Sequence, residues 1–163
     1  MPWRRFYIRS IDTLGLLEKL GEDGAFGAVT FVLADKTVSR DLLDSVGEIY
    51  FLERHIGLSS WAGGPTVLDI GAGYGRLAYR MVTAFPNVRS YVCTDAVSAS
   101  TFVCEFYLRF RGVDVNAKAV ALDEIQDELK RNPPDIAVNI HGFSGMQSLG
   151  SRLVGEASTR GRC

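Results

Sequence analysis

The sequence predicts a Rossmann-like α/β fold, an open parallel sheet covered by helices and preceded by an N-terminal helical segment. Two observations indicate this class. From residue 66 onward, short apolar runs alternate with single segments of helical period, and the first apolar run ends in a glycine-rich turn that leads directly into a helix. Strands joined by single helices form right-handed crossovers, which make a sheet parallel.

The helices and strands can be placed from caps and apolar spacing. Ser39 is a suitable N-cap for a helix in which Leu42, Val46 and Ile49 recur at helical spacing until Gly57 ends it. Strands are then expected at residues 66–70, 90–94, 117–122 and 135–140, and helices at 74–85, 98–111 and 124–131. Within residues 1–36, glycines separate a short leucine-rich helix from a strand-like run at 29–33. The sequence therefore predicts no single structure for this N-terminal segment.

Composition and charge indicate one globular domain. The chain has 163 residues, of which 47% are hydrophobic and 23% charged, with a formal net charge of -1. Without a basic excess we expect no nucleic-acid partner, and no apolar run approaches the roughly 20 residues of a membrane span.

The first residues lack the apolar segment of a secretory signal, so a cytoplasmic location is expected. The three cysteines lie in no C-x-x-C spacing, so neither a metal site nor a disulfide framework is expected.

The glycine turn carries the clearest chemical signal. Residues 67–78 read VLDIGAGYGRLA, with glycines at 71, 73 and 75. A dinucleotide fingerprint, G-x-G-x-x-G, needs a third glycine where this chain has Arg76. Asp69 instead places a carboxylate where a pyrophosphate would lie. The turn therefore favours a ligand that carries an amine or another cation.

Asp95 supplies a second signal at the end of the second predicted strand. It lies twenty residues beyond Gly75, where an acidic residue hydrogen-bonds the hydroxyls of an adenosine ribose. A ribose and a cationic group occur together in S-adenosylmethionine.

With these residues the chain resembles the class I S-adenosylmethionine-dependent methyltransferases. The resemblance implies S-adenosylmethionine as the cofactor and residues 37–147 as the α/β domain that binds it. The cofactor-binding residues that it implies are Asp69, Gly71, Gly73, Tyr74, Gly75, Asp95 and Asp123.

Residues 39–52, the segment DIGAGYGRLA and residues 135–144 are similar to sugar O-methyltransferases. This resemblance implies a small-molecule acceptor, a hydroxyl group of a sugar or a related compound. His141 follows the fourth predicted strand, at the edge of an open sheet where ligands collect. A histidine there could act as the general base that removes the proton of the acceptor hydroxyl.

Each of these positions also has a structural explanation. The glycine turn could join a strand to a helix and bind nothing, and Asp69 could accept hydrogen bonds from the turn amides. Asp95 could be a solvated strand end, Asp123 the N-cap of helix 124–131, and His141 a loop residue bonded to backbone.

The predicted sheet has four strands, whereas class I methyltransferases normally have seven, so the fold is expected to be incomplete after the fourth strand. The chain departs from the family at Gly142 and Gly145, and residues 148–163 form an irregular tail. The chain is then either a fragment or a short form with a different end. The fourth strand would be an open edge through which a homo-oligomer could form.

Two functions remain open from the sequence. One is an S-adenosylmethionine-dependent O-methyltransferase, and the other is a non-catalytic fragment or interaction module that binds S-adenosylmethionine. An NAD-binding dehydrogenase domain is disfavoured by Arg76 and by the absence of a substrate domain.

Overall fold

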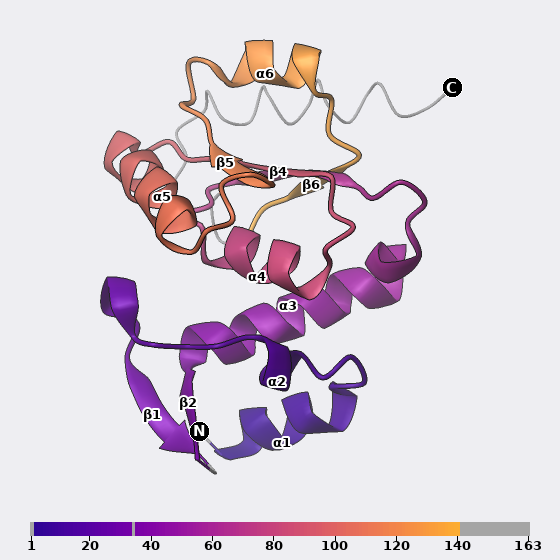
Figure 1. Cartoon of the computed structure of the whole chain (residues 1–163), viewed down its shortest axis with the longest axis vertical. Coiled ribbons are helices and arrows are strands. Elements are labelled where there is room, and N and C mark those ends of the chain that lie inside the picture. Colours follow the sequence, from indigo (N-terminus) through magenta and orange to yellow (C-terminus); the bar gives the residue numbers. More distant parts are fainter. Residues whose placement is uncertain (1, 34, 141–163) are drawn as a thin grey trace.

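A four-stranded parallel sheet forms the centre of the protein (Figure 1). The structure, a computed structural model, describes residues 2–33 and 35–140, with the backbone only for residues 2–6 and 33. The strands are β3 (Thr66–Ile70), β4 (Ser90–Thr94), β5 (Ala117–Ala119) and β6 (Ile136–Val138), hydrogen-bonded in the order β5-β4-β3-β6. Every pairing is parallel, and Leu68 lies opposite both Val92 and Ala137. This topology confirms the predicted α/β class.

The first two strands of the sheet have the predicted bounds, and the other two are shorter. The strand predicted at 117–122 ends at Ala119, opposite Cys93, and the amide of Val120 makes one last bond to the Cys93 carbonyl at 2.8 Å. The strand predicted at 135–140 ends at Val138. The next bond to β3 comes from a side chain, because the Asn139 side-chain amide donates to the Ile70 carbonyl at 2.9 Å. Both strands therefore stop at the rim where the glycine turn begins.

Helices lie on both faces of the sheet (Figure 1). Helices α4 (Arg76–Ala84) and α5 (Ser98–Phe110) cover one face, and α6 (Ile125–Arg131) covers the other. The two crossovers from β3 to β4 and from β4 to β5 run in one direction along the sheet, so right-handed connections place both helices on the same face. The return from β5 to β6 runs the opposite way, which puts α6 on the opposite face.

Helix α3 (Arg40–Ile56) packs against α4 and begins and ends as predicted. The Ser39 hydroxyl accepts a hydrogen bond from the amide of Leu42 at 2.9 Å, which satisfies one free donor of the first turn. Gly57 ends the helix in the left-handed conformation with φ of 64°. Its apolar face, including Val46 and Ile49, is fully buried.

The segment before residue 40 forms two short helices, a 3₁₀ turn and a hairpin. They are α1 (Pro2–Ile11), α2 (Leu16–Lys19), η1 (Ala25–Gly27) and the antiparallel pair β1 (Thr30–Leu33) and β2 (Lys36–Ser39). A second 3₁₀ turn, η2 (Leu58–Ser60), follows α3. The leucine-rich helix expected from the sequence is only one turn long, and the strand-like run at 29–33 is β1.

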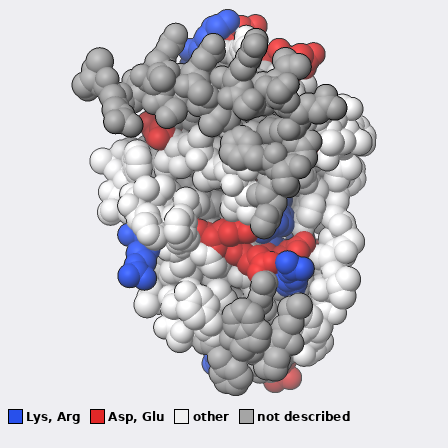
Figure 2. Space-filling model, turned by 180° about the vertical axis from the view of Figure 1, so that it is seen from behind, with Lys and Arg blue, Asp and Glu red and all other residues white. Residues whose placement is uncertain are grey.

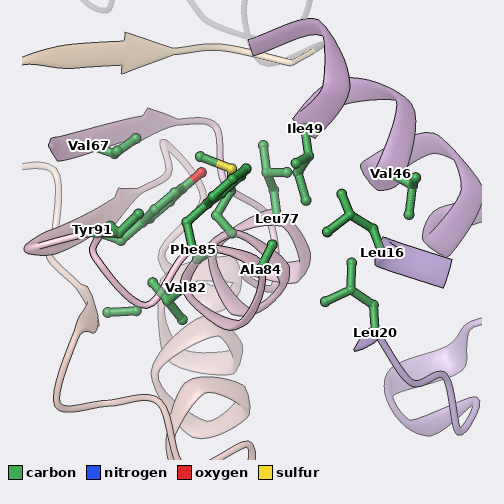
Figure 3. Close-up of a cluster of buried hydrophobic side chains, with 14 of the residues drawn as sticks. Leu16, Leu20, Val46, Ile49, Val67, Leu77, Val82, Ala84, Phe85 and Tyr91 are labelled. Carbon is green, nitrogen blue, oxygen red and sulfur yellow. The ribbon is translucent and has the colours of Figure 1, made fainter. Parts of the chain in front are cut away.

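The main hydrophobic core joins this N-terminal segment to the sheet (Figure 3). Leu16 and Leu20 face Ile49 of α3 and Leu77 of α4, and Tyr91 of β4 lies beyond them. A smaller cluster lies on the α6 side and consists of Leu68, Ile70, Val92, Val120 and Ile125. Because the N-terminal segment and the sheet with its helices bury apolar side chains in one cluster, the two parts share a core.

Among the helices in the described ranges, none is long and apolar enough to cross a membrane.

Candidate cofactor site

The glycine turn links the end of β3 to the start of α4. Gly71, Gly73 and Gly75 have φ values of 76°, 58° and 86°, a region that residues with a Cβ adopt only at a cost. The amides of Gly71 and Ala72 both donate to the Thr94 carbonyl, at 2.8 and 3.1 Å. The turn is thereby fastened to the end of β4, and α4 begins at Arg76 rather than at the predicted residue 74.

The turn borders a pocket of about 210 Å³ at the carboxyl ends of the strands. Two of the glycines differ in what surrounds them. Among the described residues, a Cβ on Gly73 would meet no atom within 4 Å, whereas a Cβ on Gly75 would lie 2.8 Å from Sγ of Cys104. Gly73 thus leaves room on the ligand side, and Gly75 allows the turn to pack closely on α5. The lining residues are Asp69, Gly71, Ala72, Gly73, Tyr74, Arg76, Leu77 and Ile140.

Asp69 lies in this pocket as a buried carboxyl group with 3% of its surface exposed. Its Oδ2 accepts a hydrogen bond from the Tyr91 hydroxyl at 3.0 Å. Burial raises the pKa of Asp69 to about 7, although the Tyr91 bond and the nearby Arg76 charge oppose this shift. In the described part of the chain no turn amide donates to Asp69. A cation entering the pocket would stabilise its ionised form.

Asp95 is the carboxylate that holds the turn. Its Oδ2 accepts a hydrogen bond from the Gly73 amide at 3.0 Å, and its Oδ1 accepts one from the Val97 amide at 2.9 Å. Each carboxylate oxygen keeps a further lone pair, so these bonds leave Asp95 able to accept hydrogen bonds from two ribose hydroxyls. The sequence-based alternative of a merely solvated strand end does not describe this side chain.

Tyr74 is held firmly at the wall of the pocket. Its hydroxyl donates to Oδ2 of Asp41 at 3.2 Å, and its ring lies parallel to that of Phe26 with centroids 6.3 Å apart. The edge of the Tyr107 ring meets it at 5.1 Å. Burial raises the pKa of Tyr74 to about 12, so the hydroxyl stays protonated at neutral pH.

Asp123 and His141 complete the predicted set. Asp123 is exposed in the turn before α6, which begins at Ile125, and no side chain in the described part of the chain caps that helix. The capping alternative for Asp123 is therefore not observed, and its contact with an adenine stays a prediction. His141 lies outside the described residues.

A network of ionic side chains beside the pocket was missed from the sequence. Arg76 donates from two guanidinium nitrogens to Glu48, at 3.0 and 3.1 Å, and also to the Ser45 hydroxyl. Arg80, only 2% exposed, donates to Ser45 at 2.8 Å and to Glu22 at 2.7 Å. Figure 2 shows acidic and basic side chains gathered together in the middle of one face of the molecule.

The signal that could have found this network is helical spacing. Arg76 and Arg80 are four residues apart on α4, while Ser45 and Glu48 lie three apart on α3. Residues three or four apart share one face of a helix. Two facing helices with these patterns bring cations and acceptors together.

The comparisons with known proteins concern the fold alone. No family model matches the chain, and no curated protein does. Among solved structures, one neighbour is a candidate sarcosine dimethylglycine methyltransferase from Galdieria sulphuraria, with 24% identity, a TM-score of 0.42, and coverage of 72% of this chain and 40% of that one. Coclaurine N-methyltransferase, solved with N-methylheliamine and SAH, has 16% identity, a TM-score of 0.41, and coverage of 75% and 37%.

A candidate O-methyltransferase from Nostoc punctiforme has 15% identity, a TM-score of 0.33, and coverage of 69% of this chain and 34% of that one. The chain thus spans about two fifths or less of the length of these neighbours. The assignment of the fold rests on the strand order and crossovers described above.

Proposed function

We propose that this chain binds S-adenosylmethionine at the glycine turn and acts as a methyltransferase. The observation that carries the proposal is that one pocket is lined by the buried Asp69 carboxyl group, which a bound cation would keep ionised, and by the Arg76 guanidinium, which Glu48 holds in place. The amino-acid end of S-adenosylmethionine carries an ammonium and a carboxylate, for which these side chains are the matching partners. A pyrophosphate would instead bring further negative charge next to Asp69.

The positions of Asp95 and Asp123 support the proposal for the ribose and the adenine of the cofactor. Asp95 follows β4 and is bonded to the turn through Gly73, so a ribose bound there would lie beside the amino-acid end. Asp123 follows β5, the strand next to β4, and is exposed where an adenine would continue. The order of strands therefore matches the order of groups along the cofactor.

We further propose that the acceptor is a hydroxyl group of a sugar or related small molecule. The support is the resemblance of residues 39–52 and 135–144 to sugar O-methyltransferases. S-adenosylmethionine supplies an already activated methyl group. The chain then has to align the acceptor and to remove the proton of its hydroxyl group. We assign the removal of this proton to His141.

Calorimetric titration tests the binding proposal. We expect S-adenosylmethionine and its demethylated product to bind and NAD to bind much more weakly. Decarboxylated S-adenosylmethionine should bind about tenfold more weakly or worse, because it lacks the group that would pair with Arg76. Tighter binding of NAD than of the demethylated product would overturn the assignment.

Methyl transfer is tested separately with labelled cofactor and a panel of sugars and nucleotide sugars. We expect His141→Ala to slow transfer by about 10²–10⁴-fold, the range for loss of a general base, with unchanged cofactor affinity. Binding without transfer to any acceptor would contradict the enzymatic proposal and support a non-catalytic binding module. Transfer that persists undiminished in His141→Ala would remove only the general-base role.

A further inference from the structure

Helix α5 presents a stripe of three phenylalanine rings to solvent. Phe102, Phe106 and Phe110 are 71%, 59% and 58% exposed, and their spacing of four residues places them along one face of the helix. The opposite face buries Cys104 and Tyr107 against the core. The rings of Phe106 and Phe110 also contact Phe26, with centroids 6.0 and 5.7 Å apart. The exposed parts of the three rings form one apolar patch, which is characteristic of a binding surface rather than of scattered exposed residues.

The stripe lies outside the lining of the cofactor pocket, and Phe26 connects the two, since its ring contacts Phe106 and Phe110 as well as Tyr74. The lining residues of the pocket belong to β3, the glycine turn, the start of α4 and Ile140, and none belongs to α5. Helix α5 packs by β5, which is the edge strand at the end of the sheet opposite β6. The stripe therefore also lies away from the β6 edge, the place where the sequence suggested oligomerisation.

The flanking charges indicate which partner fits. Glu105 and Arg109 lie beside the stripe, form an ion pair at 2.6 Å, and are both more than half exposed. If a second α5 lies antiparallel across the stripe, Glu105 meets the partner's Arg109 and Arg109 meets the partner's Glu105. The surface is thus complementary to itself, which is the requirement for a two-fold interface.

We propose that α5 is the contact surface of a homodimer in which the two α5 helices pack antiparallel through Phe102, Phe106 and Phe110. A phenylalanine side chain contributes roughly 150–250 Å² when buried, so the exposed parts of three rings supply about 400 Å² per copy. A standard interface buries about 800 Å² per partner. The dimer is therefore weak and depends on protein concentration.

Sedimentation velocity of the full chain, at concentrations from about 1 to about 200 μM, tests the aromatic contact. We expect the wild type to shift from monomer to dimer and Phe106→Glu to remain monomeric. Phe51→Glu is the matched control, because Phe51 is 62% exposed on α3 and lies outside the stripe. A wild type that stays monomeric throughout, or equal loss of dimer in both variants, would overturn the proposal.

Charge reversal tests the antiparallel arrangement. Glu105→Arg alone and Arg109→Glu alone each place like charges together across the interface, so each variant should dimerise at least about tenfold more weakly. An equimolar mixture of the two variants restores both opposite-charge contacts and should form a heterodimer. Circular dichroism confirms that each variant is folded. Folded variants that fail to associate when mixed would contradict the two-fold arrangement.

Discussion

Asp69→Asn should make the protein more stable at neutral and alkaline pH. Burial raises the pKa of Asp69 from 3.8 to about 7, which means that the folded state holds this proton more tightly than the unfolded state does. The stability due to the proton is full below about pH 4 and is lost as the pH rises through 7. Three pKa units correspond to roughly 4 kcal/mol. Asparagine has no proton to lose and still offers an oxygen to the Tyr91 hydroxyl.

Urea unfolding at intervals between about pH 5 and pH 8 measures this effect. The free energy of unfolding of the wild type should fall by about 1.4 kcal/mol per pH unit from this group between pH 5 and 7, and that slope should vanish in Asp69→Asn. At pH 8 the variant should be more stable than the wild type by about 2–4 kcal/mol. Tyr91→Phe is the companion variant, because loss of the hydrogen bond should move the titration of Asp69 to higher pH. An equal slope in the wild type and Asp69→Asn would refute the assignment of the buried proton.

Three further outcomes are expected. S-adenosylmethionine should bind the wild type about tenfold more tightly at pH 7.5 than at pH 6, because binding favours ionised Asp69, and calorimetry should find no such change in Asp69→Asn. Gly75→Ala should lower the free energy of unfolding by about 3 kcal/mol, from left-handed strain and the clash with Cys104. In urea unfolding, adding Cys104→Ala should recover part of that loss, and strictly additive losses would argue against the clash. Arg80→Met should lower the free energy of unfolding by about 3–5 kcal/mol, measured by thermal or urea unfolding, because it leaves Glu22 buried without its cation. Arg40 is exposed, so the control Arg40→Met should lower this free energy by less than about 1 kcal/mol.

Local signals were sufficient to predict α3 and the two central strands. The Ser39 cap and Gly57 bound α3 through contacts with near neighbours in the sequence. Strands β3 and β4 are almost wholly buried, and a buried parallel strand is a continuous apolar run whose ends are easily recognised. Edge strands β5 and β6 have fewer partners, so their apolar runs extend beyond the hydrogen-bonded ladder.

The N-terminal segment depends on contacts that no local pattern shows. Glu22 binds Arg80 across 58 residues, and Asp23 binds Arg111 across 88. Phe26 has φ of 64°, which is unfavourable for a bulky side chain, yet its ring meets the Tyr107 ring edge-on at 4.8 Å. Such pairs become visible only once the helices are packed.

The candidate site was predicted in position but not in detail. The glycine spacing and Asp69 placed the pocket at the end of the first sheet strand, and the structure brings these residues together. In the parallel register Asp69 lies opposite Cys93. Its hydrogen-bond partner is nevertheless Tyr91, two residues earlier on the same strand. Since the register is set by packing of the whole sheet, the partner could not be read from the sequence. The same holds for the bond from Gly73 to Asp95.

Calorimetric titration of two alanine variants with the demethylated product of S-adenosylmethionine tests the cofactor site most directly. Gly73 and Gly112 both have left-handed backbones, with φ of 58° and 66°, and a Cβ on either would meet no atom of the described residues within 4 Å. The two substitutions therefore carry similar backbone strain, but only Gly73→Ala adds a methyl group to the pocket lining. We expect Gly73→Ala to weaken binding at least about tenfold and Gly112→Ala to bind like the wild type. Binding of equal strength to Gly73→Ala and Gly112→Ala would contradict the placement of the cofactor at the glycine turn.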